Sequence, residues 1–125
     1  MLLIAALLLV LVGLMHSVLG GRRLIAPLLA RPDLPVILGS QRNSRVTLWA
    51  GWHLLTLFWW GQAVVLMTMQ FRPDLVPLAV LVTVSACCGI GAGLALVLSR
   101  GRHLSWLGFL PIAVLTAWVA LSLPA

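Results

Sequence analysis

Four long apolar runs account for most of the chain and leave little polar sequence between them. They extend over about 2–20, 46–69, 75–99 and 104–123. Each approaches the roughly 20 residues that cross about 30 Å of hydrocarbon as a helix, the conformation that pairs backbone groups within one segment. We therefore predict an all-α, polytopic integral membrane protein. Its single domain, 1–125, is expected to be an antiparallel bundle of four transmembrane helices.

The composition supports lipid as the solvent of this chain. Hydrophobic residues make up 62% of the sequence and charged residues only 8%, against about 25% charged in a typical soluble domain. The first run lacks a basic start and a small-residue cleavage site, so a transmembrane helix is favoured there over the alternative, a cleaved signal peptide.

The positive charge is concentrated at the ends of the apolar runs. The net charge is +6, from eight arginines and two aspartates. Because no basic patch is interleaved with aromatic residues, nucleic acid is not an expected partner. The expected partners are the lipid bilayer and, as further candidates, another membrane protein or a second copy of this chain.

The arginines also predict the orientation. Seven of the eight lie in two stretches, 21–45 and 100–103, whereas Arg72 lies between the second and third runs beside Asp74. The positive-inside rule places both basic loops in the cytoplasm and both termini outside, as in a multi-pass protein of the bacterial inner membrane. Within the first loop, 24–29 suits either a short interfacial segment or a plain linker.

One stripe of the second run holds the most chemically interesting residues. Trp49, His53, Thr56 and Trp60 are spaced four, three and four apart, which is one face of a helix. His16 falls at a similar depth on the preceding antiparallel helix. A candidate ligand or cofactor site therefore consists of His16, Ser17, Trp49, His53, Thr56 and Trp60.

The sequence leaves three possible roles for His16 and His53. They form interhelical hydrogen bonds, for example to Ser17 or Thr56; they hold haem or a quinone-like headgroup; or they handle protons. A metal site is not predicted, because convergent thiols and carboxylates are missing. The only carboxylates, Asp33 and Asp74, lie in different loops, so no catalytic residues are expected and the protein is interpreted as non-enzymatic.

Small residues at intervals of four predict close helix packing. One set is Gly13, Ser17 and Gly21, and the other is Ser85, Gly89 and Gly93. Such sets allow close backbone approach between transmembrane helices. The alternative is a water path or ligand slot lined by these residues. Adjacent Cys87 and Cys88 point about 100° apart, so a disulfide between them is not expected.

The stretches "MHSVLGGRRLIAPLL" and "WAGWHLLTLFWWGQA" resemble a group of uncharacterised small four-helix bacterial inner-membrane proteins. In that group the first helix ends His-Ser-x-Leu-Gly-Glu-Arg, and the second carries Trp-His followed by a Trp. The matching residues are His16, Ser17, Leu19, Gly20, Trp52 and His53. Gly21 stands where the group has Glu. The resemblance implies a four-helix membrane protein and no particular activity.

These features favour one functional class over two others. The preferred hypothesis is an accessory or ligand-binding component of a larger membrane assembly. The alternatives are a haem- or quinone-binding electron-transfer protein that uses His16 and His53, and a small oligomeric transporter or channel. A small multidrug exporter is disfavoured, because those exporters need an intramembrane Glu and this chain has none.

Overall fold

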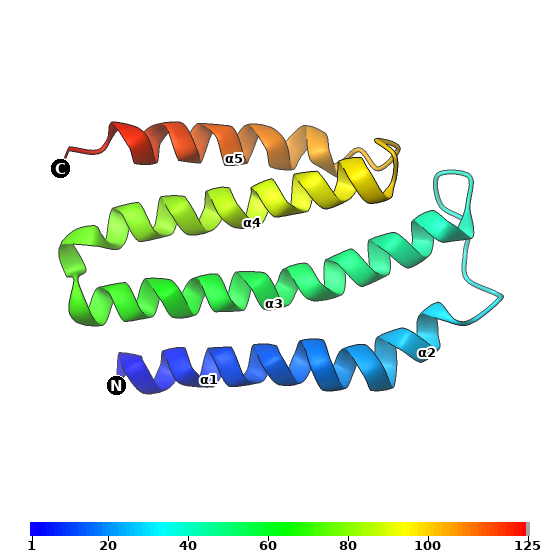
Figure 1. Cartoon of the computed structure of the whole chain (residues 1–125), viewed down its shortest axis with the longest axis horizontal. Coiled ribbons are helices and arrows are strands. Elements are labelled where there is room, and N and C mark those ends of the chain that lie inside the picture. Colours follow the sequence, from blue (N-terminus) through cyan, green and yellow to red (C-terminus); the bar gives the residue numbers. More distant parts are fainter. Residues whose placement is uncertain (125) are drawn as a thin grey trace.

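The computed structural model describes residues 1–124. Within 1–124, four helical rods are long and apolar enough to cross a membrane. Figure 1 shows them side by side, each antiparallel to the next. The prediction of an all-α, four-helix chain is confirmed. The elements are α1 (Leu2–Met15), the π-helix η1 (His16–Ile25), α2 (Ala26–Leu29), α3 (Gln41–Phe71), the 3-10 turn η2 (Pro73–Leu75), α4 (Val76–Leu98) and α5 (Ser105–Ser122).

The first two helices are longer than the apolar runs that predicted them. The first rod runs on through η1 and α2 to Leu29, and α3 already begins at Gln41. The predicted cytoplasmic loop 21–45 is therefore too long, and the connection is only 30–40. Arginine ends a hydrophobic run without ending a helix, because it is a good helix former. The start of α3 is fixed by Ser40, whose Oγ accepts a hydrogen bond from the Asn43 N–H at 3.2 Å.

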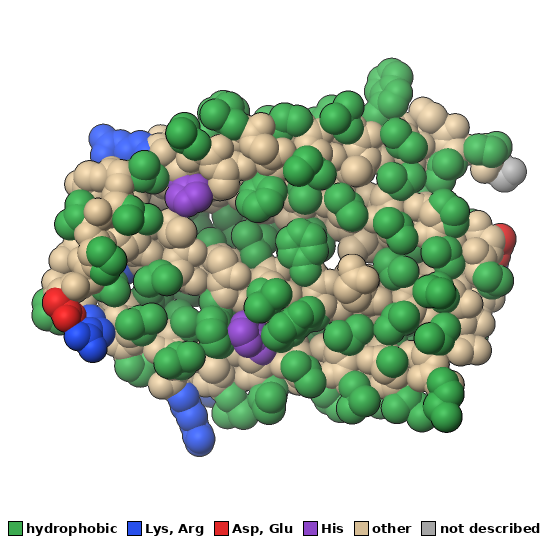
Figure 2. All heavy atoms as spheres, turned by 180° about the vertical axis from the view of Figure 1, so that it is seen from behind, with side chains coloured by type: hydrophobic (Ala, Val, Ile, Leu, Met, Phe, Trp, Pro, Cys, Tyr) green, Lys and Arg blue, Asp and Glu red, His purple; other side chains and the backbone are tan. Residues whose placement is uncertain are grey.

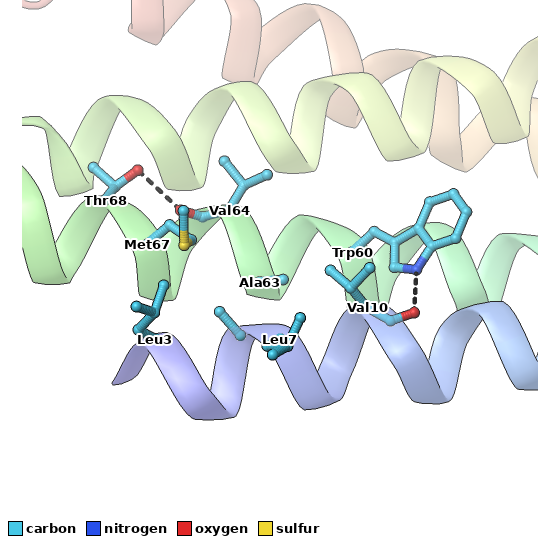
Figure 3. Close-up of a pocket in the computed structure, with 9 residues that line it drawn as sticks. Leu3, Leu7, Val10, Trp60, Ala63, Val64, Met67 and Thr68 are labelled. Atoms are coloured by element: carbon cyan, nitrogen blue, oxygen red, sulfur yellow. Dashed lines mark hydrogen bonds between the residues drawn. The ribbon is translucent and has the colours of Figure 1, made fainter. Parts of the chain in front are cut away.

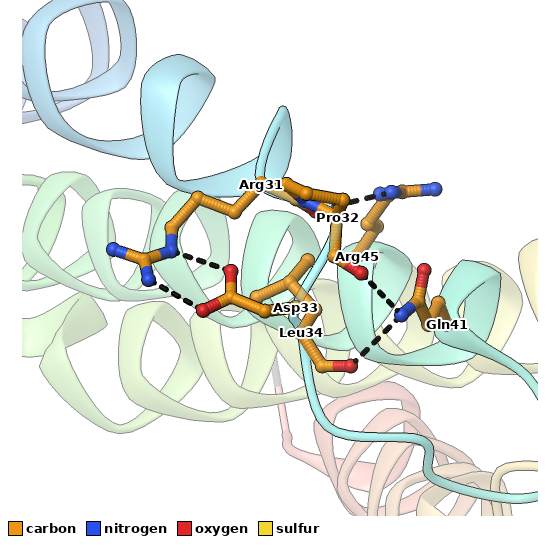
Figure 4. Close-up of polar contacts among 6 residues, drawn as sticks. All are labelled: Arg31, Pro32, Asp33, Leu34, Gln41 and Arg45. Carbon is orange, nitrogen blue, oxygen red and sulfur yellow. Dashed lines mark hydrogen bonds and ion pairs between the residues drawn. The ribbon is translucent and has the colours of Figure 1, made fainter.

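The connection between α2 and α3 is tied back onto the helices. The Gln41 side-chain amide donates to the carbonyls of Pro32 at 2.7 Å and Leu34 at 3.2 Å. The Arg45 guanidinium donates to the Leu29 carbonyl at 2.8 Å, which joins the end of α2 to the second turn of α3. Figure 4 shows the two Gln41 bonds, together with a bond from Arg45 to the Arg31 carbonyl at 3.3 Å. The segment 24–29, predicted as an interfacial segment or a linker, is thus helical and held against α3.

The chain's two aspartates are both used in local ion pairs. Asp33 pairs with Arg31 at 2.5 Å, and Asp74 pairs with Arg72 at 2.8 Å. The neighbouring guanidinium group lowers the pKa of each carboxyl below its ordinary value. Because the sequence has no other acidic side chain, the remaining arginines have no carboxylate side chain to pair with.

The four rods form an open bundle in which each rod contacts only its neighbours along the chain. Within 1–124, α1 packs on α3, α3 on α4, and α4 on α5, while α1 does not reach α4 or α5. No large side chain in this part of the chain is fully buried. The burial instead falls on small residues at the helix contacts, among them Ala6, Ala63, Cys87, Cys88, Ala92 and Ala113. Such a surface suits lipid, which covers apolar side chains at no cost.

Small residues bring α3, α4 and α5 close together. A Cβ added at Gly61 of α3 would lie 2.2 Å from the Thr83 methyl carbon of α4, so the absence of a side chain at Gly61 makes room for that methyl group. On the other side of α4, the Ser85 hydroxyl donates to the Ala113 carbonyl of α5 at 2.9 Å, and Gly89 faces Ala113. Gly93, the third member of the predicted set, has no side chain or other helix within 4 Å of its added Cβ among the described residues.

The turn from α4 to α5 closes with a left-handed cap. The Gly101 N–H donates to the Leu96 carbonyl at 2.8 Å, and the Arg100 N–H donates to the Val97 carbonyl at 3.4 Å, which is the Schellman pattern. The left-handed residue after the helix is Arg100, with φ of 55°, followed by Gly101 with φ of 75°. Glycine usually occupies that position, because a side chain there costs roughly 1–2 kcal/mol.

We expect Gly61→Ala to destabilise the protein even though alanine is the better helix former. The added methyl must displace Thr83, and overpacking of this kind costs about 1–3 kcal/mol. Gly51→Ala is the matched control, because a Cβ at Gly51 meets nothing within 4 Å and gains up to about 1 kcal/mol of helix propensity. Thermal unfolding in detergent should show a lower melting temperature for Gly61→Ala and an unchanged or higher one for Gly51→Ala.

The double variant Gly61→Ala/Thr83→Ser tests the cause of that loss. Serine removes the methyl that the new Cβ would meet, so the double variant should recover most of the melting temperature. Equal stability of the Gly61→Ala and Gly51→Ala variants would contradict the close α3–α4 contact.

Candidate functional site

Glycines of the first rod pack against tryptophans of α3. A Cβ added at Gly13 would lie 2.5 Å from Trp60 Nε1, and one added at Gly20 would lie 2.6 Å from Trp52 Cζ2. The missing side chains let the indoles reach backbone carbonyls of the first rod. Trp60 Nε1 donates to the Val10 carbonyl at 3.2 Å. The seam, meaning the contact between the first rod and α3, is therefore built from hydrogen bonds as well as close packing.

The π-helix lies at the centre of this seam. It begins at His16 and ends at Ile25, and the N–H that follows it, on Ala26, bonds to the Gly21 carbonyl five residues back. Helical segments with this wider winding are rare and occur frequently at functional sites. Here the wide turn carries two of the predicted site residues, His16 and Ser17, together with Gly20 and Gly21.

His16 forms a reciprocal pair with Trp52. Its ring stacks on the indole with centroids 3.8 Å apart and planes 12° apart, and its Nε2 donates to the Trp52 carbonyl at 3.3 Å. In return, Trp52 Nε1 donates to the His16 carbonyl at 3.1 Å. Trp59 adds an edge contact at 4.9 Å. Since a carbonyl only accepts, His16 carries its proton on Nε2.

A second network joins Ser17, His53 and Thr56. The Ser17 hydroxyl lies 2.8 Å from His53 Nδ1 and 3.0 Å from Thr56 Oγ1. When Ser17 donates to Thr56, His53 Nδ1 donates to Ser17 and Nε2 is an acceptor. When both hydroxyls reverse, Ser17 donates to Nδ1 and Nε2 carries the proton. Both tautomers of His53 are therefore compatible with the Ser17 contact, because a hydroxyl can accept from Nδ1–H or donate to an unprotonated Nδ1.

The other nitrogen of His53, Nε2, has no hydrogen-bond partner within 1–124. No buried side-chain nitrogen or oxygen in that range lacks a partner, so Nε2 is accessible. His53 lines a cavity of about 370 Å³ together with Ser17, Gly21, Arg22 and Trp49. It also lines a smaller, apolar cavity of about 260 Å³ bounded by Trp60 and α4. The Trp49 and His53 rings are 4.8 Å apart and tilted by 58°.

A larger apolar cavity continues along the same seam, away from the arginines. Its volume is about 720 Å³, and Figure 3 shows its lining side chains between α1 and α3. Its lining is Leu3, Ala6, Leu7, Val10, Trp60, Ala63, Val64, Met67 and Thr68. The Thr68 hydroxyl is already bonded to the Val64 carbonyl at 2.9 Å, which leaves the walls effectively apolar. Trp60 lines both this cavity and the smaller one at His53, and His53 lines both that smaller cavity and the one at Arg22, so neighbouring cavities share a lining residue.

The predicted site residues thus fall into two neighbouring groups. Ser17, His53 and Thr56 share one hydrogen-bond network, Trp49 contacts the His53 ring, and Trp60 lines the adjacent cavities. His16 instead turns to Trp52 and Trp59, on the second aromatic stripe of α3. Arg22 and Trp52 were not in the predicted site. Both could have been included from their positions in the sequence, because Arg22 lies five residues beyond Ser17 and Trp52 directly precedes His53.

The other side chains that could ligate a metal or react, namely the two cysteines and His103, lie apart from this site. Within 1–124, no three His, Cys, Asp or Glu side chains come together as a metal site would require. Cys87 and Cys88 are buried and not bonded to one another, and Cys87 Sγ donates weakly to the Leu57 carbonyl at 3.8 Å. His103 has its own partner, Ser105, at 2.8 Å in the α4–α5 turn.

No known family model matches this sequence, and neither the curated proteins nor the solved structures contain a significantly similar chain. The resemblance in the first two helices therefore stays a prediction, and the site has to be interpreted from its own geometry.

Ser17→Ala should destabilise the seam. Interhelical side-chain hydrogen bonds in membranes average about 0.6 kcal/mol, with a maximum near 1.7. Ser17 makes two of them, so we expect a loss of about 1 kcal/mol in the free energy of unfolding, measured by denaturation in mixed micelles. Ser122→Ala is the control, because that hydroxyl bonds only to its own helix at the Trp118 carbonyl. Equal stability of the two variants would contradict the Ser17 network.

Proposed function

We propose that this protein is a ligand-binding component of a membrane assembly, and that its ligand is a long-chain quinone that enters sideways from the lipid. The observation that carries this proposal is that His53 lines a cavity while its Nε2 has no partner within 1–124 and its Nδ1 bonds to Ser17, which in turn bonds to Thr56. Intramembrane ionisable side chains are costly and commonly mark functional sites.

The hydroxyl network suits both redox forms of such a ligand. A quinone carbonyl needs a hydrogen-bond donor, whereas a quinol hydroxyl can give its proton to an acceptor. His53 offers a donor at Nε2 in one tautomer and an acceptor in the other, and the Ser17 hydroxyl matches either one at Nδ1. Arg22 lines the same cavity and supplies a second donor for a headgroup oxygen.

The rest of the seam suits the ring and the tail. Trp49 and Trp60 lie to either side of His53 along α3 and offer flat apolar faces to a ring. Beyond Trp60, the cavity of about 720 Å³ has apolar walls and opens along the α1–α3 contact. A polar head at His53 and a hydrocarbon tail in this cavity match an amphipathic molecule dissolved in the bilayer.

Haem fits less well than a quinone. A haem ligated by both histidines needs two imidazoles on opposite sides of one iron. His16 Nε2 is bonded to the Trp52 carbonyl and its ring is stacked on Trp52. Ligation through that nitrogen would break this reciprocal pair, whereas quinone binding at His53 leaves it intact.

The proposed location is the bacterial inner membrane with the arginine-rich end in the cytoplasm. Most arginines gather at the end of the bundle that carries the two turns 30–40 and 99–104, and Figure 2 shows blue side chains at that end. The positive-inside rule supports this orientation. The headgroup of the ligand would then lie in the cytoplasmic half of the bilayer.

A quinone should quench the tryptophan fluorescence of the purified protein. We expect saturable quenching by decylubiquinone in detergent, because Trp49 and Trp60 border the proposed site. His53→Gln should weaken the apparent affinity about tenfold, which is the loss of one strong hydrogen bond. His103→Gln is the matched control and should bind like the unmodified protein, since His103 lies in the α4–α5 turn.

Two further measurements separate recognition from partition into the micelle. n-Decylbenzene, which has the tail without the headgroup oxygens, should compete weakly. Identical quenching curves for His53→Gln, His103→Gln and the unmodified protein would contradict quinone binding at His53.

The open bundle favours a second role beside ligand binding, that of an accessory subunit. α5 packs only on α4 and exposes large apolar side chains along its length, with Trp118 73% and Leu121 88% exposed. Lipid can cover this face, and so can another transmembrane helix.

Mild solubilisation tests the accessory role. We expect the tagged protein to co-purify with a stoichiometric membrane partner in digitonin, and Trp118→Ala to reduce that recovery at least several-fold while leaving decylubiquinone binding unchanged. Recovery of the tagged protein alone in every mild detergent would contradict the assembly role and leave the quinone proposal standing.

A further inference from the structure

A small polar pocket lies at the arginine-rich end, away from the α1–α3 seam. It forms where the first turn of α3 meets the turn between α4 and α5, and its volume is about 210 Å³. Its lining is Ser40, Arg42, Asn43, Ser99, Arg100 and Arg102. The volume is below the roughly 300–1,000 Å³ of pockets that hold drug-sized ligands. The pocket therefore suits a compact group such as a phosphate.

The charge of this pocket is uncompensated within the described chain. Arg42, Arg100 and Arg102 all line it, and none of them has an ion pair in 1–124. The two aspartates are engaged elsewhere, with Arg31 and Arg72. Three like charges around one hollow repel each other, so an anion from outside the chain would relieve that repulsion. Guanidinium groups are well matched to phosphate oxygens.

Hydrogen bonds fix the backbone on both sides of this pocket. Arg100 has a left-handed backbone conformation at a position where glycine is usual, so an arginine is present here although the backbone favours glycine. The Arg102 N–H bonds to the Ser99 carbonyl at 3.3 Å, and the Ser99 hydroxyl accepts from the His103 N–H at 2.9 Å. Across the pocket, the Ser40 cap fixes the first turn of α3, where Arg42 lies.

From this charge and geometry we propose that Arg42, Arg100 and Arg102 bind a phosphate group, presented either by an anionic lipid headgroup or by free phosphate. The three guanidinium groups donate to the phosphate oxygens. The bound anion then links the start of α3 to the α4–α5 turn, so binding stabilises the arginine-rich end of the bundle.

The test compares melting temperatures with and without each source of phosphate. In detergent at constant ionic strength, inorganic phosphate replaces chloride. In nanodiscs, phosphatidylglycerol replaces phosphatidylcholine. Stabilisation in the first arm identifies free phosphate as sufficient, and stabilisation in the second arm alone identifies the lipid headgroup. Either result supports the site if Arg42→Gln and Arg102→Gln each weaken the apparent affinity about tenfold.

Two variants separate binding from folding. Arg100→Gly removes one ligand group and relieves the left-handed side chain, so it should raise the melting temperature without phosphate by several degrees and shrink the gain on adding phosphate. Arg23→Gln removes an exposed arginine that lines none of the cavities described above and should respond like the unmodified protein. The proposal is overturned if neither phosphate source stabilises the protein, or if Arg42→Gln and Arg102→Gln respond as Arg23→Gln does.

Discussion

Helices surrounded by lipid have no hydrophobic drive to associate with one another, because hydrocarbon is as apolar as leucine. Contact must come from close packing and from hydrogen bonds that cross between helices. In this chain the first rod is held to α3 in both ways, with indole N–H groups donating to carbonyls that glycines leave uncovered. The cavity at His53 exists because this contact is locally open on one side and tightly closed at Trp52.

The wide turn of the first rod is part of that arrangement. The π-helix starts at His16, the residue whose carbonyl receives the Trp52 indole N–H. Its next residue, Ser17, connects to His53 and Thr56. Two adjacent residues of one turn thus contact two different sides of α3. His16 stacks on Trp52, and Ser17 joins the hydroxyl network beside the cavity. The proposed ligand therefore binds at His53 and not at His16, whose ring is already engaged with Trp52.

Composition and periodicity were enough to predict the four helices, because the length and apolarity of a membrane span leave few alternatives. The helix ends were less predictable. Arg22 and Arg23 mark the end of apolar sequence while the backbone winding continues to Leu29. The second helix is underestimated in the same way at its start, where polar residues from Gln41 to Arg45 form the first turns of α3.

The site was predictable only in part. A period of 3.6 residues places Trp49, His53, Thr56 and Trp60 on one stripe, and the structure turns that stripe towards the first rod. The same period cannot say which helix face His16 meets, since π winding changes its direction. The arginine pocket could not be predicted from the sequence either. Arg42 and Arg100 are far apart in the chain and line one pocket only because α3 and α4 pack together.

The succession of contacts has a consequence for biogenesis. Each rod touches only the rods made just before and just after it, so no segment has to wait for a distant one before it finds its partner. Pairings between consecutive hairpins close short loops, which is entropically cheap and kinetically fast. The rods can therefore assemble in the order in which the ribosome delivers them, with the contact between the first rod and α3 formed before α4 packs on α3.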